Sequence, residues 1–161
     1  MKKAYLGIGT NMGDRFENLQ SAVDSLNLLP TTKVTAVSRV YETDPVGFSN
    51  QDDFLNIVVE ICTDLTAEGL LGTCLGIEAG FGRIRNFKNG PRIIDIDLLL
   101  YDTQIFDTPM LILPHPRMFE REFVLRPLMD IDFDSPLVDR EKIRNGLTGD
   151  GIRLTKYQIK I

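Results

Sequence analysis

Two aspartates, Asp95 and Asp97, stand two residues apart in the otherwise apolar stretch 93–101. Side chains alternate between the two faces of a β-strand, so a strand here places both carboxylates on one face, roughly 7 Å apart. Two carboxylates this close on an apolar strand repel each other unless a cation lies beside them. Oxygen ligands of this kind favour Mg²⁺, which shares its coordination sphere with waters and substrate phosphates. The alternative interpretation is a solvated edge strand whose charges discourage aggregation.

A cationic segment, residues 83–92, leads directly into this strand. It contains Arg83, Arg85, Lys88 and Arg92 and no acid, in a chain with a net charge of −5. Guanidinium groups match phosphate oxygens in a bidentate geometry. A magnesium–polyphosphate substrate needs metal ligands on one side and donors on the other, and this sequence supplies both. The alternative is a solvated loop whose cations pair with nearby acids.

A third cluster begins at His115, which lies between Pro114 and Pro116 and therefore has a restrained backbone. His115 is a candidate hydrogen-bond partner for a phosphate, although a single histidine often has a structural role. Arg121 is a second candidate for phosphate binding, or an ion-pair partner of a neighbouring glutamate. Phe123 fits either a binding site or the hydrophobic core.

Composition limits the class of protein. The chain has 161 residues, 43% hydrophobic and 25% charged, which predicts one domain over residues 1–161. Its excess of acidic over basic residues argues against nucleic-acid and anionic-membrane partners. Cys62 and Cys74 are too few for a disulfide framework. The apolar run at the start is too short for an export signal, so a cytoplasmic location is expected.

Hydrophobic periodicity predicts an α+β fold. The order strand–helix–strand–strand–helix–strand is that of a ferredoxin-like split βαβ sandwich, with helices on one face of an antiparallel sheet. Two long irregular stretches, 42–53 and 81–90, are expected to act as lids. The predicted strands cover residues 4–8, 34–41, 54–62 and 93–101, with a short edge strand at 104–106 and a final strand within 152–161. The predicted helices cover 14–30, 66–80 and a stretch from residue 114 whose clearest apolar part is 123–129.

Taken together, these motifs resemble the 6-hydroxymethyl-7,8-dihydropterin pyrophosphokinases of folate biosynthesis. The resemblance covers residues 3–135, and no role is assigned to the tail beyond residue 140. It implies a ferredoxin-like enzyme that transfers pyrophosphate from ATP to the pterin hydroxymethyl group and releases AMP. We expect the enzyme to be a monomer. The motifs that carry it are Gly82-Arg83-x-Arg85, Gly90-Pro91-Arg92-x-x-Asp95-x-Asp97, Pro114-His115-Pro116-Arg117-Met118 and Arg121-x-Phe123.

The resemblance also implies roles for individual residues. Asp95 and Asp97 would hold two Mg²⁺ ions, and Arg83 and Arg92 would act with them in catalysis. The residues implied to bind ATP are Glu78, Arg85, Arg92, Leu98, His115 and Arg121. Those implied to bind the pterin are Thr43, Pro45, Val46, Gly47, Phe54, Asn56 and Phe123.

Two other classes of function remain open from the sequence. A ferredoxin-like module that binds a nucleotide without catalysis would need the cationic segment but not the aspartate pair. A dinucleotide-binding reductase is suggested by the glycines at 7, 9 and 13. Their spacing departs from the dinucleotide-binding pattern, and tight packing of a strand on a helix explains them as well.

Overall fold

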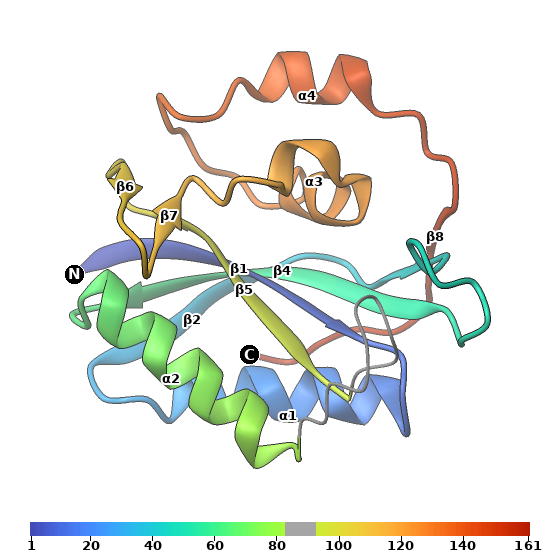
Figure 1. Cartoon of the computed structure of the whole chain (residues 1–161), viewed down its shortest axis with the longest axis horizontal. Coiled ribbons are helices and arrows are strands. Elements are labelled where there is room, and N and C mark those ends of the chain that lie inside the picture. Colours follow the sequence, from blue (N-terminus) through green and yellow to red (C-terminus); the bar gives the residue numbers. More distant parts are fainter. Residues whose placement is uncertain (83–92) are drawn as a thin grey trace.

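The computed structural model describes residues 1–82 and 93–161 (Figure 1). The described strands are β1 (Lys2–Thr10), β2 (Thr32–Val37), β3 (Tyr41–Thr43), β4 (Phe54–Thr63), β5 (Asp95–Tyr101), β6 (Phe106–Asp107), β7 (Ile112–Leu113) and β8 (Ile152–Leu154). The described helices are α1 (Arg15–Asn27), α2 (Ala67–Gly80), a 3-10 turn η1 (Met118–Glu120), α3 (Glu122–Leu128) and α4 (Arg140–Gly146). None of these helices is long and apolar enough to cross a membrane.

The main sheet has six strands and confirms the predicted fold class. Its order is β5-β1-β4-β3-β8, with β2 pairing along the other half of β4, and every strand pair is antiparallel. The β1–α1–β2 and β4–α2–β5 units therefore interleave as a ferredoxin-like sandwich does. This arrangement places β1 and β4 in the centre of the sheet. Two of the predicted pterin-binding residues, Phe54 and Asn56, lie on β4.

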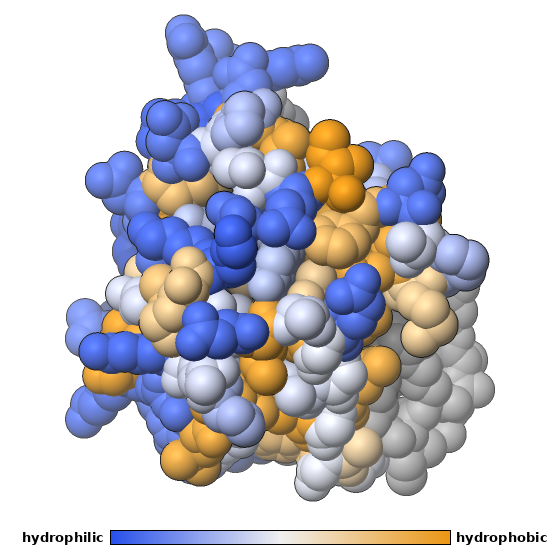
Figure 2. Space-filling model, turned by 90° about the vertical axis from the view of Figure 1, so that its left-hand side faces the viewer, coloured by the Kyte–Doolittle hydropathy of each residue, from blue (hydrophilic) through white to orange (hydrophobic). Residues whose placement is uncertain are grey.

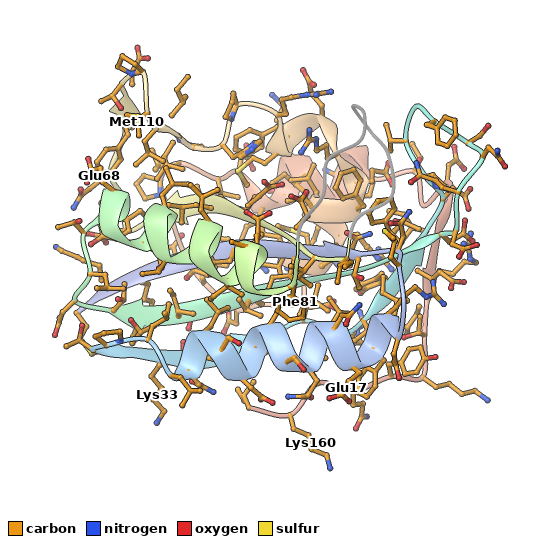
Figure 3. All side chains as sticks on the ribbon, turned by 60° about the horizontal axis from the view of Figure 1, so that its bottom comes forward. Glu17, Lys33, Glu68, Phe81, Met110 and Lys160 are labelled. Atoms are coloured by element: carbon orange, nitrogen blue, oxygen red, sulfur yellow. The ribbon has the colours of Figure 1, made fainter. Side chains whose placement is uncertain are left out.

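Helices α1 and α2 cover one face of the sheet, as Figure 3 shows from their side. Each begins where the sequence predicts a cap: Asp14 accepts a hydrogen bond from the backbone N–H of Glu17, and Thr66 accepts one from Gly69. The apolar stripe of α1 at Leu19 and Val23 is fully buried against the sheet. The predicted positions of both helices are thus confirmed.

The expectation that all helices lie on one face is wrong, because α3 and α4 cover the opposite face (Figure 1). A second core forms there, in which Val124 and Leu128 of α3 and Ile143 of α4 pack with Tyr5 and Leu100 of the sheet. The central strands are consequently buried on both faces. That burial accounts for the nearly continuous apolar sequence of β4.

Three strand boundaries also differ from those predicted. The strand expected over 34–41 is two strands, because β2 has a register shift between Val34 and Ala36 and ends at Val37. The loop after β3 therefore begins at Asp44 rather than residue 42. The predicted edge strand at 104–106 is a hairpin of β6 and β7, separate from the main sheet. Figure 2 views this end of the molecule, where apolar and hydrophilic surfaces lie side by side. Met110, just before β7, is 78% exposed.

The C-terminal segment runs from one face of the sheet to the other. After α4 it adds β8 to the edge of the sheet beside β3, which confirms the first half of the predicted final strand. It then continues along α1, where the ring of Tyr157 stacks on Phe16 with centroids 4.9 Å apart. Near its end, Gln20 and Lys160 exchange hydrogen bonds of 2.8 and 2.9 Å (Figure 3).

Candidate active site

A cavity of about 740 Å³ opens on the side of the sheet that carries α3. Its volume is typical of small-molecule sites. Strands β1, β4 and β5 supply its floor, and the segment from His115 into α3 supplies one wall. The lining residues are Gly7, Ile8, Gly9, Thr43, Val46, Phe54, Asn56, Ile57, Asp95, Asp97, His115, Arg117, Glu120, Arg121, Glu122, Phe123, Val124, Thr148, Asp150 and Ile152.

Asp95 and Asp97 both line this cavity, as their spacing predicts. Between and beside them, Ile94 and Ile96 point into the core on the α1–α2 side. The Nη1 atom of Arg121 lies 3.7 Å from Oδ2 of Asp97. The strand therefore presents two carboxylates to a partly open space on one face and an apolar surface on the other.

This donor set fits Mg²⁺ that arrives with a polyphosphate. Within the described residues, no group of three or more His, Cys, Asp and Glu side chains gathers to hold a metal ion. A protein site built from two carboxylates leaves most of an octahedral coordination sphere to waters and phosphate oxygens, which is the usual arrangement for Mg²⁺ bound with nucleotides. The aspartate pair is thus suited to a shared ion rather than to a permanent metal centre.

His115 is held with one ring nitrogen turned to the backbone. Its backbone N–H donates to the carbonyl oxygen of Leu99 (2.9 Å), and the N–H of Arg117 donates to Nδ1 (3.2 Å). Because Nδ1 accepts a hydrogen bond, the neutral ring carries its proton on Nε2. Burial lowers the pKa of His115, and the nearby charges of Arg121 and Arg117 lower it further. The ring is therefore a neutral donor near pH 7.

Arg121 and Phe123 enter the cavity at the start of α3. The guanidinium carbon of Arg121 lies 5.6 Å from the centroid of the Phe123 ring, within the range of a cation–π contact. Val124 and Leu125, the next two residues, are buried in the second core. This anchoring fixes the direction of the first turn of α3, so that Arg121 lies toward Asp97 while Phe123 forms part of the cavity wall.

Across the cavity, the ends of β1, β3 and β4 bring together a polar pair. The amide nitrogen of Asn56 donates to the hydroxyl of Thr43 (2.7 Å), and both side chains are buried, at 6% and 3% exposure. Gly9 is paired with Asn56 across the two strands. A Cβ atom at Gly9 would lie 2.6 Å from Oδ1 of Asn56, so this close approach requires glycine.

The structure does not bring every residue of the predicted site into the cavity. Glu78 and Leu98 are buried, at 2% and 4% exposure, and do not line it. Pro45 and Gly47 flank Val46, which does line it. Arg83, Arg85 and Arg92 lie outside the described residues.

One wall of the cavity comes from the C-terminal tail, for which no role could be predicted from the sequence. Thr148, Asp150 and Ile152 line the cavity, and Glu122 accepts hydrogen bonds from the backbone N–H groups of Thr148 (2.6 Å) and Gly149 (2.9 Å). Burial opposes ionisation of Glu122, but these bonds lower its pKa. The Gly149-Asp150-Gly151 turn is the one local signal at this place, and it does not reveal a long-range contact.

A family model and two similar proteins carry the name of the same pyrophosphokinase. Residues 5–133 match the family model described as 7,8-dihydro-6-hydroxymethylpterin-pyrophosphokinase (HPPK). The 2-amino-4-hydroxy-6-hydroxymethyldihydropteridine pyrophosphokinase of Bacillus subtilis is 43% identical over 96% of this chain and 91% of its own length. The protein of the same name from Methylorubrum extorquens is 46% identical over 91% of this chain and 92% of its own.

A solved structure shares the fold. A crystal structure of Plasmodium falciparum HPPK-DHPS superposes with a TM-score of 0.67 at 14% sequence identity. The match covers 96% of this chain and 47% of that one, so this chain spans about half of the solved protein. With the family match over most of the sequence, the chain belongs to the 7,8-dihydro-6-hydroxymethylpterin-pyrophosphokinase family.

Proposed function

We propose that the cavity binds ATP and 6-hydroxymethyl-7,8-dihydropterin together and that pyrophosphate passes from the nucleotide to the pterin. Membership of the family identifies the reaction as pyrophosphoryl transfer to hydroxymethyldihydropterin in folate biosynthesis. The observation that carries the proposal is that one cavity joins a carboxylate pair and phosphate-binding groups to a buried amide and two aromatic rings.

The nucleotide side of the site is assigned to β5 and the segment before α3. Asp95 and Asp97 would hold the Mg²⁺ ions, which when bound neutralise phosphate charge and orient the triphosphate. Arg121 lies next to Asp97 and can bind a phosphate oxygen from the same side. His115, neutral with its proton on Nε2, is placed to donate a hydrogen bond. The roles of Arg83, Arg85, Arg92, Glu78 and Leu98 rest on the resemblance alone.

The pterin side is assigned to the ends of β3 and β4 and to Phe123. The rings of Phe54 and Phe123 line the cavity and offer aromatic faces for a flat heterocycle. Asn56 carries both a carbonyl oxygen and an amide group, so it can match the alternating donors and acceptors on a pterin edge. Thr43 holds that amide in place through its hydroxyl.

The reaction depends mainly on how the two substrates are positioned relative to each other. The pterin hydroxymethyl oxygen bonds to the β-phosphorus of ATP as the bond from that phosphorus to the α–β bridging oxygen breaks. AMP leaves, and the hydroxyl proton is lost to solvent. Phosphoryl transfers of this type depend on in-line alignment and charge stabilisation more than on a covalent enzyme intermediate. The site supplies that alignment by holding the two substrates in one cavity, on strands that are separated by β1.

The test is to identify the nucleotide product. The purified protein is incubated with ATP, Mg²⁺ and the hydroxymethyl-dihydropterin, and nucleotides are separated by chromatography. AMP that appears only with the pterin, and that is lost when Mg²⁺ is chelated, supports the proposal. ADP as the sole product would indicate an ordinary kinase, and nucleotide binding without turnover would indicate a binding module.

We also propose that the enzyme works as a cytoplasmic monomer. One copy of the chain supplies both the carboxylate pair and the aromatic and amide groups that face it across the cavity. A mass of 18.2 kDa by light scattering would support the monomer, whereas a larger mass that persists on dilution would contradict it.

A further inference from the structure

The tail contributes a distinct piece of the site, residues 148–154, which we call the C-terminal strap. It follows α4 and lies beside the loop between β3 and β4 (Figure 1). Three of its residues, Thr148, Asp150 and Ile152, line the cavity. The strap therefore touches the site while belonging to neither the nucleotide side nor the pterin side described above.

Arg153 of the strap binds both ends of the loop 44–53. Its Nη1 donates to Oδ1 of Asp44 (2.9 Å), and its Nη2 donates to Oδ2 of Asp53 (2.8 Å). Its Nε lies 3.6 Å from Oε1 of Glu42. Asp44 is the first residue of the loop and Asp53 the last, so a single guanidinium joins the two points where the loop leaves the sheet.

The strap backbone reinforces this contact. Ile152 pairs with Thr43 in the sheet, and the backbone N–H of Asp44 donates to the carbonyl oxygen of Gly151 (2.9 Å). Gly151 has a φ of 69°, and a Cβ atom there would lie 2.9 Å from Oδ2 of Asp44. Both the backbone conformation and the close approach favour glycine.

The other end of the strap is tied to α3. Glu122 accepts the hydrogen bonds of Thr148 and Gly149, and the next residue is Phe123. The strap thus connects the two walls between which the pterin is expected: the Thr43–Phe54 side through Arg153, and the Phe123 side through Glu122.

We propose that the C-terminal strap sets the spacing of the pterin site and that Arg153 is a positioning residue for pterin binding. This inference rests on the proposed function, because it names the substrate that the spacing serves. Arg153 itself is not a lining residue of the cavity. It acts through Asp44 and Asp53, whose neighbours Thr43 and Phe54 do line the cavity.

Three acids, Glu42, Asp44 and Asp53, converge on Arg153. A second guanidinium, that of Arg15, donates to Oε2 of Glu42 (2.8 Å) and to the carbonyl oxygen of Asp53 (3.0 Å), whereas Arg153 bonds the carboxylates of Asp44 and Asp53. Without Arg153 the carboxylates of Asp44 and Asp53 repel each other. The pairing of Thr43 with Phe54 still joins the two strands, so we expect the loop ends to shift rather than to separate. Because Arg153 is 45% exposed, its loss should affect overall stability little.

The test is Arg153→Ala, assayed by steady-state AMP formation with each substrate varied in turn. The KM for the pterin should rise about three- to tenfold, the range expected for a small network of exposed ion pairs. The kcat and the KM for ATP should change less than about twofold, since the interaction contributes to binding of one substrate. Arg153→Lys, which keeps the charge, should recover part of the loss.

Arg39→Ala is the matched control. Arg39 is also exposed and makes a bidentate contact to one carboxylate, Asp130, away from the cavity. Because its partner Asp130 is largely buried, at 14% exposure, Arg39→Ala should lower the thermal stability without altering the KM for the pterin. An Arg153→Ala enzyme with an unchanged pterin KM, or with equal increases in both KM values, would overturn the inference. An increase in the pterin KM of Arg39→Ala as large as that of Arg153→Ala would also overturn it.

A double-mutant cycle adds a second check. If Arg153 acts through the loop, Arg153→Ala should have little further effect on pterin KM in an Asp53→Asn background. Full additivity would contradict that route. Failure of the proposed function is distinguishable, because then the unmodified protein would form no AMP, whereas failure of this inference leaves its turnover intact.

Discussion

Asp95 and Asp97 combine two properties that rarely occur on a strand of a packed sheet: they are ionisable, and they face a cavity rather than bulk solvent. The alternation of side chains on β5 is enough to place them, because Ile94 and Ile96 must enter the core. Their placement could therefore be predicted from the sequence. The position of Arg121 beside Asp97 could not, since it depends on how α3 packs.

Replacing Asp97 with Asn should remove most of the activity. The amide keeps the shape of the side chain but not its charge, and loss of metal-held charge stabilisation is expected to cost about 4 kcal/mol, or roughly a thousandfold in kcat. AMP formation measures the loss. Asp102→Asn is the control, because Asp102 follows the same strand and forms an ion pair with Lys2 outside the cavity. Near-normal turnover of Asp97→Asn would contradict the metal assignment.

His115 should titrate below its ordinary pKa of 6.5. Between the lowered pKa and 6.5 the unfolded chain binds more protons than the folded one, so the contribution of His115 to stability is present above pH 6.5 and is lost as the pH falls through the folded-state pKa. Because it is the single histidine of the chain, its two carbon-bound ring protons are the imidazole signals to follow in a proton NMR titration.

Arg121→Gln should raise that pKa, because it removes a charge that disfavours the imidazolium form. A midpoint at or above 6.5 in the unmodified protein would show that burial does not control the ring. An unchanged midpoint in Arg121→Gln would show that the guanidinium does not face it.

How well each helix or strand could be predicted from the sequence depends on how far apart in the chain its contacts are. Strands β1, β4 and β5 and helices α1 and α2 follow from local periodicity and caps, and all of these predictions are confirmed. The continuous apolar run of β4 also indicates that both faces of the sheet are covered, although the helices were expected on one face alone. Strand β3 was missed because its three residues show no periodicity of their own.

The C-terminal strap could not be predicted for a different reason. Its contacts join Glu122 to Thr148 and Arg153 to Asp44 and Asp53, which are far apart in the sequence. No local propensity encodes such pairs. The sequence alone therefore predicts no role for the tail, although it provides a wall of the site.

The pairing of β1 with β4 leads to a prediction about Gly9. In Gly9→Ala the new Cβ would lie 2.6 Å from Oδ1 of Asn56, which is buried and held by Thr43, so the amide must move. We expect a loss of about 1–3 kcal/mol in unfolding free energy and a higher KM for the pterin, with a smaller change in the KM for ATP.

Gly7→Ala on the same strand provides the comparison. A Cβ atom there would meet the side chain of Leu99 at 3.6 Å or more, an ordinary contact, so both effects should be smaller. Denaturant unfolding and steady-state kinetics measure the two effects separately. Equal effects of the two substitutions would show that the contact with Asn56 is not the cause.

For the whole molecule, charge decides how a triphosphate can bind. The chain is acidic overall, with a net charge of −5. Among the described lining residues, the acids outnumber the arginines; the acids are Asp95, Asp97, Glu120, Glu122 and Asp150, and the arginines are Arg117 and Arg121. A polyphosphate would be repelled by this part of the wall unless divalent cations enter with it. The fold thus places an acidic surface where a metal-bound nucleotide, rather than the free anion, is the complementary ligand.

The most direct test is a crystal structure of the protein with Mg²⁺, a non-hydrolysable ATP analogue and the hydroxymethyl-dihydropterin. The account predicts carboxylate oxygens of Asp95 and Asp97 about 2.0–2.1 Å from Mg²⁺ ions that also bind the analogue's phosphates, with the pterin hydroxyl facing the β-phosphorus. Mg²⁺ bound by the phosphates alone, with both carboxylates turned away from them, would contradict it.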